Sequence, residues 1–316
     1  MIISQIFITL TKDPMKKILS LFWSSPHSLL TMTTLMWAGH ANVLKISIGE
    51  ISPMLLMGLR WIGCFIILLI FLWPDVKSQI PIVRKRLPWV WLMGGFGMAG
   101  FTICLIIAAQ HTTAINLGIT QSFIPALVMI IGLLFLKTSI TKVQGIGLIL
   151  SLVGAFILVG GGSLETIKNM KFNFGDIIML AGCFCYAGYT VGLTNRISMS
   201  PQVMFVFFSF FASITLSAGI LLESIQGDLI WPGIKGWAVI GYCIIFPSIL
   251  AQIFFMRGVE LIGANRAGLY VNLVPVFTAI LAVIILSEKL FLFHILSLLL
   301  VLSGIYITEK YKKENK

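Results

Sequence analysis

A group of polar side chains interrupts an apolar stretch in the first fifty residues. Residues 35–45 read LMWAGHANVLK and place an indole, an imidazole, an amide and an ammonium among hydrophobic neighbours. Trp37 and His40 are three residues apart and share a helix face, so they are candidates to line a cavity that binds a solute. The alternative for His40 is a hydrogen bond that only joins two helices. Lys45 is expected to reach the polar surface, and Asn42 to hydrogen-bond a neighbouring helix.

Further polar side chains stand in apolar runs later in the chain. Tyr186 and Tyr189 repeat the spacing of Trp37 and His40, and their hydroxyls would give an aromatic cavity polar handles. Ordinary aromatic packing is the alternative. Three amides also lie in apolar runs and are expected to hydrogen-bond a solute, the alternative being that they satisfy backbone opened by a nearby proline. The expected solute-binding set is Trp37, His40, Gln121, Tyr186, Tyr189, Gln252 and Asn272.

Arg60 lies inside an apolar run and keeps its charge at every physiological pH. A buried guanidinium must meet a carboxylate, backbone carbonyls or water. Glu50 is the acidic residue on the preceding turn, so we favour a structural role in which Arg60 pairs with Glu50 or with the backbone. The alternative is that Arg60 receives an anionic group of a solute.

Two prolines interrupt apolar runs at corresponding places. Pro125 and Pro275 each lie near the middle of a run. Proline removes a backbone hydrogen bond from a helix and permits a kink. Paired interruptions of this kind are typical of solute sites between membrane repeats, so we expect a hinge or kink at both.

The sequence contains no residue set that indicates catalysis, a metal site or a cofactor. The four histidines are scattered, the five cysteines lie in apolar runs without metal-ligand spacing, and no Gly-Lys-Ser/Thr loop is present for a nucleotide. No carboxylate lies in the middle of an apolar run, which argues against a proton-coupled exporter of lipophilic cations. A neutral, zwitterionic or weakly acidic solute fits better, with His40 or His111 as a candidate proton carrier.

The composition indicates a lipid environment for most of the chain. Of its 316 residues, 58% are hydrophobic and 10% are charged, whereas soluble domains carry about 25% charged residues. The net charge of +11 would suggest nucleic acid in a soluble protein, but the cytoplasmic loops of membrane proteins also collect Lys and Arg. We therefore expect no nucleic acid partner, and we expect Arg84, Lys85 and Arg86 to meet anionic lipid.

The apolar runs predict an all-α integral membrane protein, because a helix satisfies its own backbone hydrogen bonds in lipid. Ten runs are long enough to span a bilayer. Most of the 22 Lys and Arg residues fall in the links on the side of the N-terminus, so both termini are expected to be cytoplasmic. The ten predicted helices cover about 28–46, 53–73, 89–109, 114–136, 143–161, 175–193, 201–222, 237–256, 265–286 and 290–308.

An internal repeat divides these helices into two sets. The segment AINLGITQSFIPAL (114–127) aligns without gaps on ANRAGLYVNLVPVF (264–277), and the register continues through Gly154 and Gly304. WAGH at 37–40 aligns on YAGY at 186–189. Five helices per copy is an odd number, so the second copy must be inverted. Inverted repeats recur in secondary transporters, whose solute site lies between the copies.

The motifs that mark these repeats resemble a known family. They are Trp37, Gly39, Asn42 and Lys45, then SPMLLMGLRW (52–61), GDIIMLAGCFCYAGYT (175–190) and VELIGANRAGLYVNLVPVFTAILAVIILSEKL (259–290). With them, nearly the whole chain after residue 28 resembles the EamA type of the drug/metabolite transporter superfamily. The resemblance implies transport of small metabolites such as amino acids, nucleotide-like solutes or vitamins, through a cavity lined by both repeats. The Glu-containing turn that the family has in both halves is present at Glu288 only.

The expected organisation follows from these boundaries. Residues 1–27 form a cytoplasmic segment whose first fourteen residues precede an alternative start at Met15, 28–161 and 175–308 form the two repeats, 162–174 link them, and 309–316 form a basic tail. We expect a secondary transporter of the bacterial inner membrane that binds a small solute and lipid, with a monomer as the simplest state. The alternatives are a multispanning enzyme that acts on a lipid and a scaffold that transports nothing.

Overall fold

The computed structural model describes residues 13–138, 140–169, 171–286 and 290–310, and all regular structure in these ranges is helical. The first half contains α2 (Asp13–Ser24), α3 (Pro26–Ile46), α4 (Pro53–Lys85), α5 (Leu87–Trp91), η1 (Leu92–Met98), α6 (Ala99–His111), α7 (Ala114–Ser122), α8 (Ile124–Leu136), α9 (Lys142–Val159) and α10 (Leu164–Lys168). The second half contains α11 (Phe174–Gly192), η2 (Leu193–Asn195), α12 (Pro201–Gln226), α13 (Ile234–Cys243), η3 (Ile244–Leu250), α14 (Ala251–Ile262), α15 (Ala264–Leu269), η4 (Tyr270–Asn272), α16 (Leu273–Leu286) and α17 (Leu292–Lys310).

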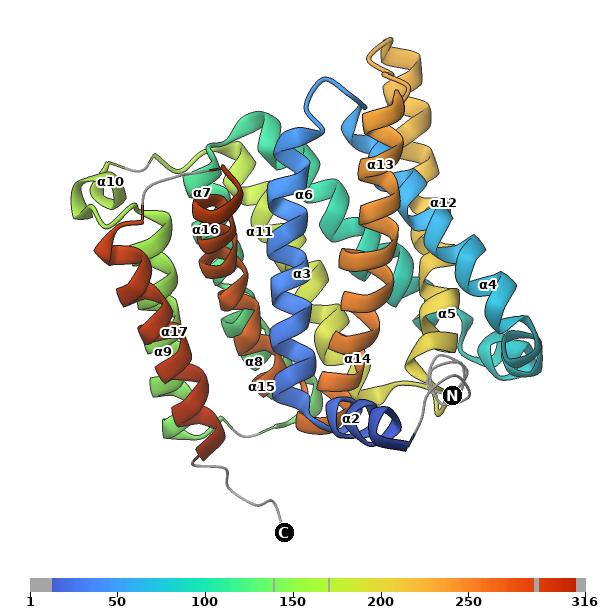
Figure 1. Cartoon of the computed structure of the whole chain (residues 1–316), viewed down its shortest axis with the longest axis horizontal. Helices are drawn as coiled ribbons and strands as arrows, with labels where there is room; N and C mark the ends of the chain where they lie inside the picture. Colours follow the sequence, from blue (N-terminus) through green and yellow to red (C-terminus); the bar gives the residue numbers. More distant parts are fainter. Residues whose placement is uncertain (1–12, 139, 170, 287–289, 311–316) are drawn as a thin grey trace.

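Eight to ten helical spans make up the bundle in the described part of the chain. Where consecutive elements are counted as one span, eight helices are long and apolar enough to cross a membrane. Two more, α3 and α17, have 21 and 19 residues and run through the same bundle in Figure 1. The chain is therefore an all-helical, multi-pass membrane protein, as its hydropathy predicts.

One of the predicted helix boundaries was wrong. We expected a helix at 53–73 followed by a basic link, but α4 continues for 33 residues through Pro74 and Pro81 to Lys85. Each proline costs a backbone hydrogen bond, yet Val76 and Val83 remain buried on this extension, so packing holds it. The predicted linker 162–174 also contains the short helix α10, whose first turn is capped by the Ser163 side chain.

The arrangement of the helices follows the repeat. Helix α3 of the first half packs against α14 and α16 of the second half. Its counterpart α11 of the second half packs against α6 and α8 of the first half, which correspond to α14 and α16 in the repeat. The pair α4 and α12 forms one edge of the bundle in Figure 1, and the pair α9 and α17 forms the other. We call the side on which α2 lies and α17 ends the terminal side, and the other the opposite side.

Glycines allow α9 and α17 to approach closely, and these close contacts follow the symmetry of the repeat. A Cβ added to Gly304 would collide with the carbonyl oxygen of Gly147, and one added to Gly154 would lie 2.9 Å from that of Ser297. Gly147 corresponds to Ser297 and Gly154 to Gly304, because the repeat offset is 150 residues in both cases. The two close contacts are exchanged by the repeat, so the halves are related by an approximate twofold axis. Their inverted orientation follows from the odd number of spans in each half.

Candidate functional site

Aromatic side chains from both halves meet in the middle of the bundle. Trp37 of α3 lies with its ring 5.9 Å from that of Tyr186 on α11 and 5.3 Å from that of Phe255 on α14. Tyr186 in turn lies 5.6 Å from Tyr189 and 5.2 Å from Phe101 of α6. We call this set, together with Phe208 of α12, the central aromatic cluster: Trp37, Phe101, Tyr186, Tyr189, Phe208 and Phe255.

The cluster lies where the two repeats touch. Trp37 and Tyr186 are counterparts in the repeat, so their edge-to-face contact places the approximate twofold axis between them. Tyr189 is the counterpart of His40, and its side chain is only 1% exposed. Both tyrosines fall inside α11, which packs against α6 and η1 of the other half. The i, i+3 pairs predicted from the sequence therefore do bring Trp37, Tyr186 and Tyr189 together.

Polar atoms of the cluster are incompletely paired. The Trp37 indole donates a hydrogen bond to the carbonyl oxygen of Pro247 at 3.1 Å, and the Tyr189 hydroxyl donates to the Gln252 amide oxygen at 3.4 Å. The Tyr186 hydroxyl is buried and has no partner in the described part of the chain. An unpaired buried polar group costs about 1–3 kcal/mol, and each such case needs an explanation.

Wide turns in both repeats flank the cluster. The segments η1 (Leu92–Met98) and η3 (Ile244–Leu250) are π-helical and occupy the same place in the third span of each half. Short π-helical segments are rare and concentrate at functional sites. In this protein η3 contributes the Pro247 carbonyl to Trp37, while the Gly97 backbone in η1 packs directly against the Tyr189 side chain.

His40 faces a different neighbourhood from Trp37. Its Nε2 lies 3.1 Å from Arg60 Nη1 on α4, and its Nδ1 lies 3.4 Å from the Cys243 sulfur on α13. The Arg60 guanidinium also lies over the Trp61 ring, 4.8 Å from its centroid. We call His40, Arg60, Trp61 and Cys243 the Arg60 cluster; it begins one helical turn along α3 from Trp37.

The expected pairing of Arg60 with Glu50 was wrong. Glu50 instead forms an ion pair with Lys235 at 3.3 Å at the surface of the opposite side. Arg60 bonds His40, a partner that no sequence spacing indicated, because the two residues come from different helices.

Of the remaining predicted site residues, only Gln252 contacts the central aromatic cluster in the described part of the chain. Asn272 donates to the Ser151 hydroxyl at 2.9 Å and so joins η4 to α9. Gln121 is half-buried near the end of α7. Pro125 and Pro275 stand in the first turns of α8 and α16, directly after breaks in the fourth span of each half. These breaks are where the sequence predicted kinks.

Two other predictions can be placed in the structure. Asn42 donates to the Thr278 carbonyl at 3.2 Å and joins α3 to α16, as expected for a residue that bridges helices. His111, proposed as a proton carrier, lies at the exposed end of α6 against Phe174. The Lys45 side chain and Glu288 lie outside the described residues.

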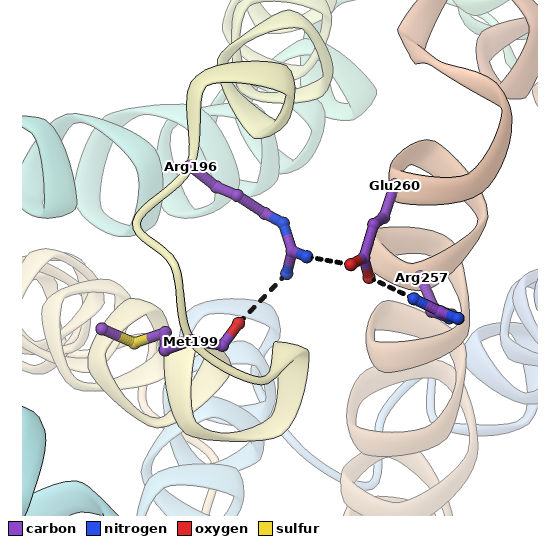
Figure 2. Close-up of polar contacts among 4 residues, drawn as sticks. All are labelled: Arg196, Met199, Arg257 and Glu260. Atoms are coloured by element: carbon purple, nitrogen blue, oxygen red, sulfur yellow. Dashed lines mark hydrogen bonds and ion pairs between the residues drawn. The ribbon is translucent and has the colours of Figure 1, made fainter.

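An ion network closes the terminal side. Glu260 of α14 accepts hydrogen bonds from Arg196 and, at 2.8 Å, from Arg257. Figure 2 shows Arg196 also donating to the Met199 carbonyl, at 3.2 Å, within the link after η2, while the ion pair of Arg196 with Glu260 ties this link to α14. Arg266, six residues after Glu260, donates from its Nε to the Ile262 carbonyl at 2.8 Å.

Among the described residues, no group of three or more His, Cys, Asp or Glu side chains is arranged to hold a metal ion. The polar groups around the centre are instead indole, phenol, amide and guanidinium groups. Such groups bind organic solutes by stacking and hydrogen bonding. The fold and these groups define a polytopic membrane protein of two inverted repeats with a polar-aromatic centre.

Comparison with known proteins agrees with this class. The model of the EamA-like transporter family matches residues 25–160 and 173–309, and the chain belongs to this family. It is therefore a membrane transporter rather than an enzyme.

Several relatives cover most of the chain. It is 28% identical over 269 residues to the "Uncharacterized transporter YyaM" of Bacillus subtilis, covering 84% of this chain and 87% of the relative. An "Uncharacterized transporter" of Archaeoglobus fulgidus is 27% identical over 290 residues, covering 90% and 97%. The "Uncharacterized inner membrane transporter YedA" of Escherichia coli K12 is 24% identical over 260 residues, covering 78% of each chain. A solved crystal structure shares the fold with a TM-score of 0.73 at 18% identity, covering 90% of this chain and 96% of that one.

Proposed function

We propose that the protein is a secondary transporter that carries a small metabolite across the bacterial inner membrane by alternating access. The solute would bind in the central aromatic cluster, between the two repeats. Its class would be a neutral, zwitterionic or weakly acidic metabolite, such as an amino acid, a nucleotide-like solute or a vitamin. In this proposal the two repeats are residues 28–161 and 175–308, and the Lys and Arg distribution supports a cytoplasmic location for both termini.

The observation that carries the proposal is the unpaired Tyr186 hydroxyl at the interface of the repeats. A solute that accepts or donates a hydrogen bond there would remove the cost of burying this group. Trp37, which meets the same ring edge to face, would supply a planar surface, and the Gln252 amide would supply a second polar contact. A site at the interface of inverted repeats can be exposed to either side when the halves rock.

The contacts that would open and close the site can be named on the terminal side. Three of them join the two halves: Phe22 packs on Phe254, Trp23 lies under Arg257, and His27 hydrogen-bonds the Tyr270 hydroxyl at 2.5 Å. Opening to the terminal side would require these contacts to break.

A second set of contacts joins the halves on the opposite side. Both carboxylate oxygens of Glu223 accept from backbone N–H groups at the start of α4, at 3.2 and 3.0 Å. The Lys235–Glu50 ion pair and the bond from Ser52 N–H to the Ile230 carbonyl add to this closure. Alternating access would break the two sets in turn, never together.

The test is solute counterflow in liposomes. Vesicles loaded with an unlabelled solute would be exposed to the same solute in labelled form, across a panel of amino acids, nucleosides and vitamins. The proposal expects at least one solute to exchange faster than in empty vesicles. It also expects Tyr189→Phe, which loses the bond to Gln252, to slow this exchange about 2- to 10-fold. Tyr306→Phe, at an exposed tyrosine of α17, is the matched control. A protein that exchanges no member of the panel contradicts the proposal.

A further inference from the structure

The guanidinium of Arg60 is buried in the bundle, and no carboxylate of the described residues pairs with it. Its side chain is only 8% exposed, and its Nε has no hydrogen-bond partner among the described residues. The contacts that it does make are with neutral groups, since Nη1 meets His40 and the guanidinium lies over Trp61. The Trp61 indole nitrogen beside it is also buried without a partner. Two adjacent donors thus lack an acceptor.

Two described carboxylates on this side of the bundle are engaged elsewhere. Glu50 pairs with Lys235, and Glu223 accepts from the backbone of Met54 and Leu55. Within the described residues, Arg60 forms no ion pair. A charge removed from water without a partner costs several kcal/mol, so a fold that keeps one has a use for it.

His40 fixes the position of the guanidinium through one of its terminal nitrogens. Because arginine only donates, His40 Nε2 must accept from Arg60 Nη1, which leaves Nδ1 to carry the proton toward the Cys243 sulfur. His40 is three residues from Trp37 on α3, a rise of about 4.5 Å. An anion bound by Arg60 would therefore lie about one helical turn from the stacking surface of the central aromatic cluster.

We propose that Arg60 binds the carboxylate of the transported solute, and that the solute is an organic acid whose planar or apolar body rests on Trp37 and Tyr186. This inference rests on the proposed function and narrows its solute class. Guanidinium and carboxylate match in a bidentate, charge-assisted pair. His40 is a positioning residue in this arrangement, because it acts through Arg60.

The test compares acids with their amides, which have nearly the same shape and no charge. Purified protein in detergent would be heated with nicotinate or nicotinamide, and with phenylacetate or phenylacetamide. A ligand that binds the folded state raises the apparent Tm with its concentration. We expect one or both acids to raise the Tm and their amides to do so at least about 10-fold less effectively, as the loss of a charged hydrogen bond predicts.

The matched variants are Arg60→Gln and Arg84→Gln, both on α4. Arg60→Gln should weaken acid binding about 10- to 100-fold and leave weak amide binding unchanged. Arg84→Gln, at an exposed position near the end of the helix, should bind acids like the native protein. Equal effects of acid and amide, no effect of either, or acid binding that survives Arg60→Gln would each overturn the inference.

Counterflow of the same four compounds separates this inference from the proposed function. If the amides exchange as fast as the acids, the proposed transport function is supported and the proposed anion site at Arg60 is contradicted. If acid binding requires Arg60 but no solute is exchanged, the proposed anion site is supported and the proposed transport function is contradicted.

Discussion

The arginine side chains on the two sides of the bundle differ in whether a carboxylate pairs with them. On the terminal side, Arg196 and Arg257 share the carboxylate of Glu260. Toward the opposite side, Arg60 is more deeply buried, and its contacts with described residues are the His40 ring and the face of Trp61. The first group has its anion within the protein, whereas no described carboxylate pairs with Arg60. A structural contact is complete in the resting protein, whereas a binding site is completed by what it binds.

The difference in pairing predicts opposite effects on stability. Removing one member of a compensated network leaves uncompensated charge behind, whereas removing an uncompensated cation relieves a cost. The predictions that follow start with the largest expected effect.

Glu260→Gln should lower the stability of the purified protein by about 1–3 kcal/mol, because it leaves two half-buried arginines without their carboxylate. Thermal inactivation in detergent measures the change as a fall in apparent Tm. Glu165→Gln, at an exposed position on α10, is the control and should leave the Tm in place. An unchanged Tm for Glu260→Gln would mean that the network of Figure 2 contributes nothing to the closed terminal side.

Arg60→Gln should leave the free energy of unfolding unchanged or raise it by about 1 kcal/mol, since glutamine can still donate to His40 and carries no charge. The same measurement on Arg257→Gln should show a fall. If Arg60→Gln lowers the Tm as far as Arg257→Gln does, then Arg60 is a structural residue and the contrast between the two groups disappears.

Tyr186→Phe removes the unpaired hydroxyl at the centre without changing the ring. Its stability should hold or improve, because a buried group without a partner is lost. Solute affinity in counterflow should fall about 2- to 10-fold, the worth of one neutral hydrogen bond. Tyr306→Phe provides the comparison at an exposed tyrosine. Unchanged affinity alongside reduced stability would indicate that the hydroxyl serves packing.

Lys235→Ala should have the smallest effect, below about 0.5 kcal/mol, because its ion pair with Glu50 is solvent-exposed. Chemical unfolding or the apparent Tm would show it. A loss as large as that of Glu260→Gln would mean that exposure does not decide which of the ion pairs matters.

The fold was largely predictable because lipid leaves the backbone few choices. Apolar runs of spanning length must be helices, and the offset of 150 residues between Gly154 and Gly304 indicates that the second half repeats the first. The end of α4 was not predictable in the same way, because Pro74 and Pro81 normally end a helix and only tertiary burial of Val76 and Val83 keeps this one intact.

In the central aromatic cluster, only the contacts between residues that are counterparts in the repeat could be predicted from the sequence. Spacing paired Trp37 with His40 and Tyr186 with Tyr189, and alignment of the halves made Trp37 and Tyr186 counterparts. Spacing could not tell which neighbour each helix face meets. His40 turns to Arg60 and Asn272 turns to Ser151, and both contacts join segments that are far apart in the sequence.

The central claim is that the solute is carried where Trp37 and Tyr186 bring the two repeats together. Counterflow by the native protein, Trp37→Leu and Trp91→Leu tests it most directly, because Trp91 is a half-exposed indole at the end of α5. We predict that Trp37→Leu loses exchange of every solute that the native protein exchanges, while Trp91→Leu retains it. Exchange at the native rate by Trp37→Leu, in protein that reconstitutes normally, would contradict the claim.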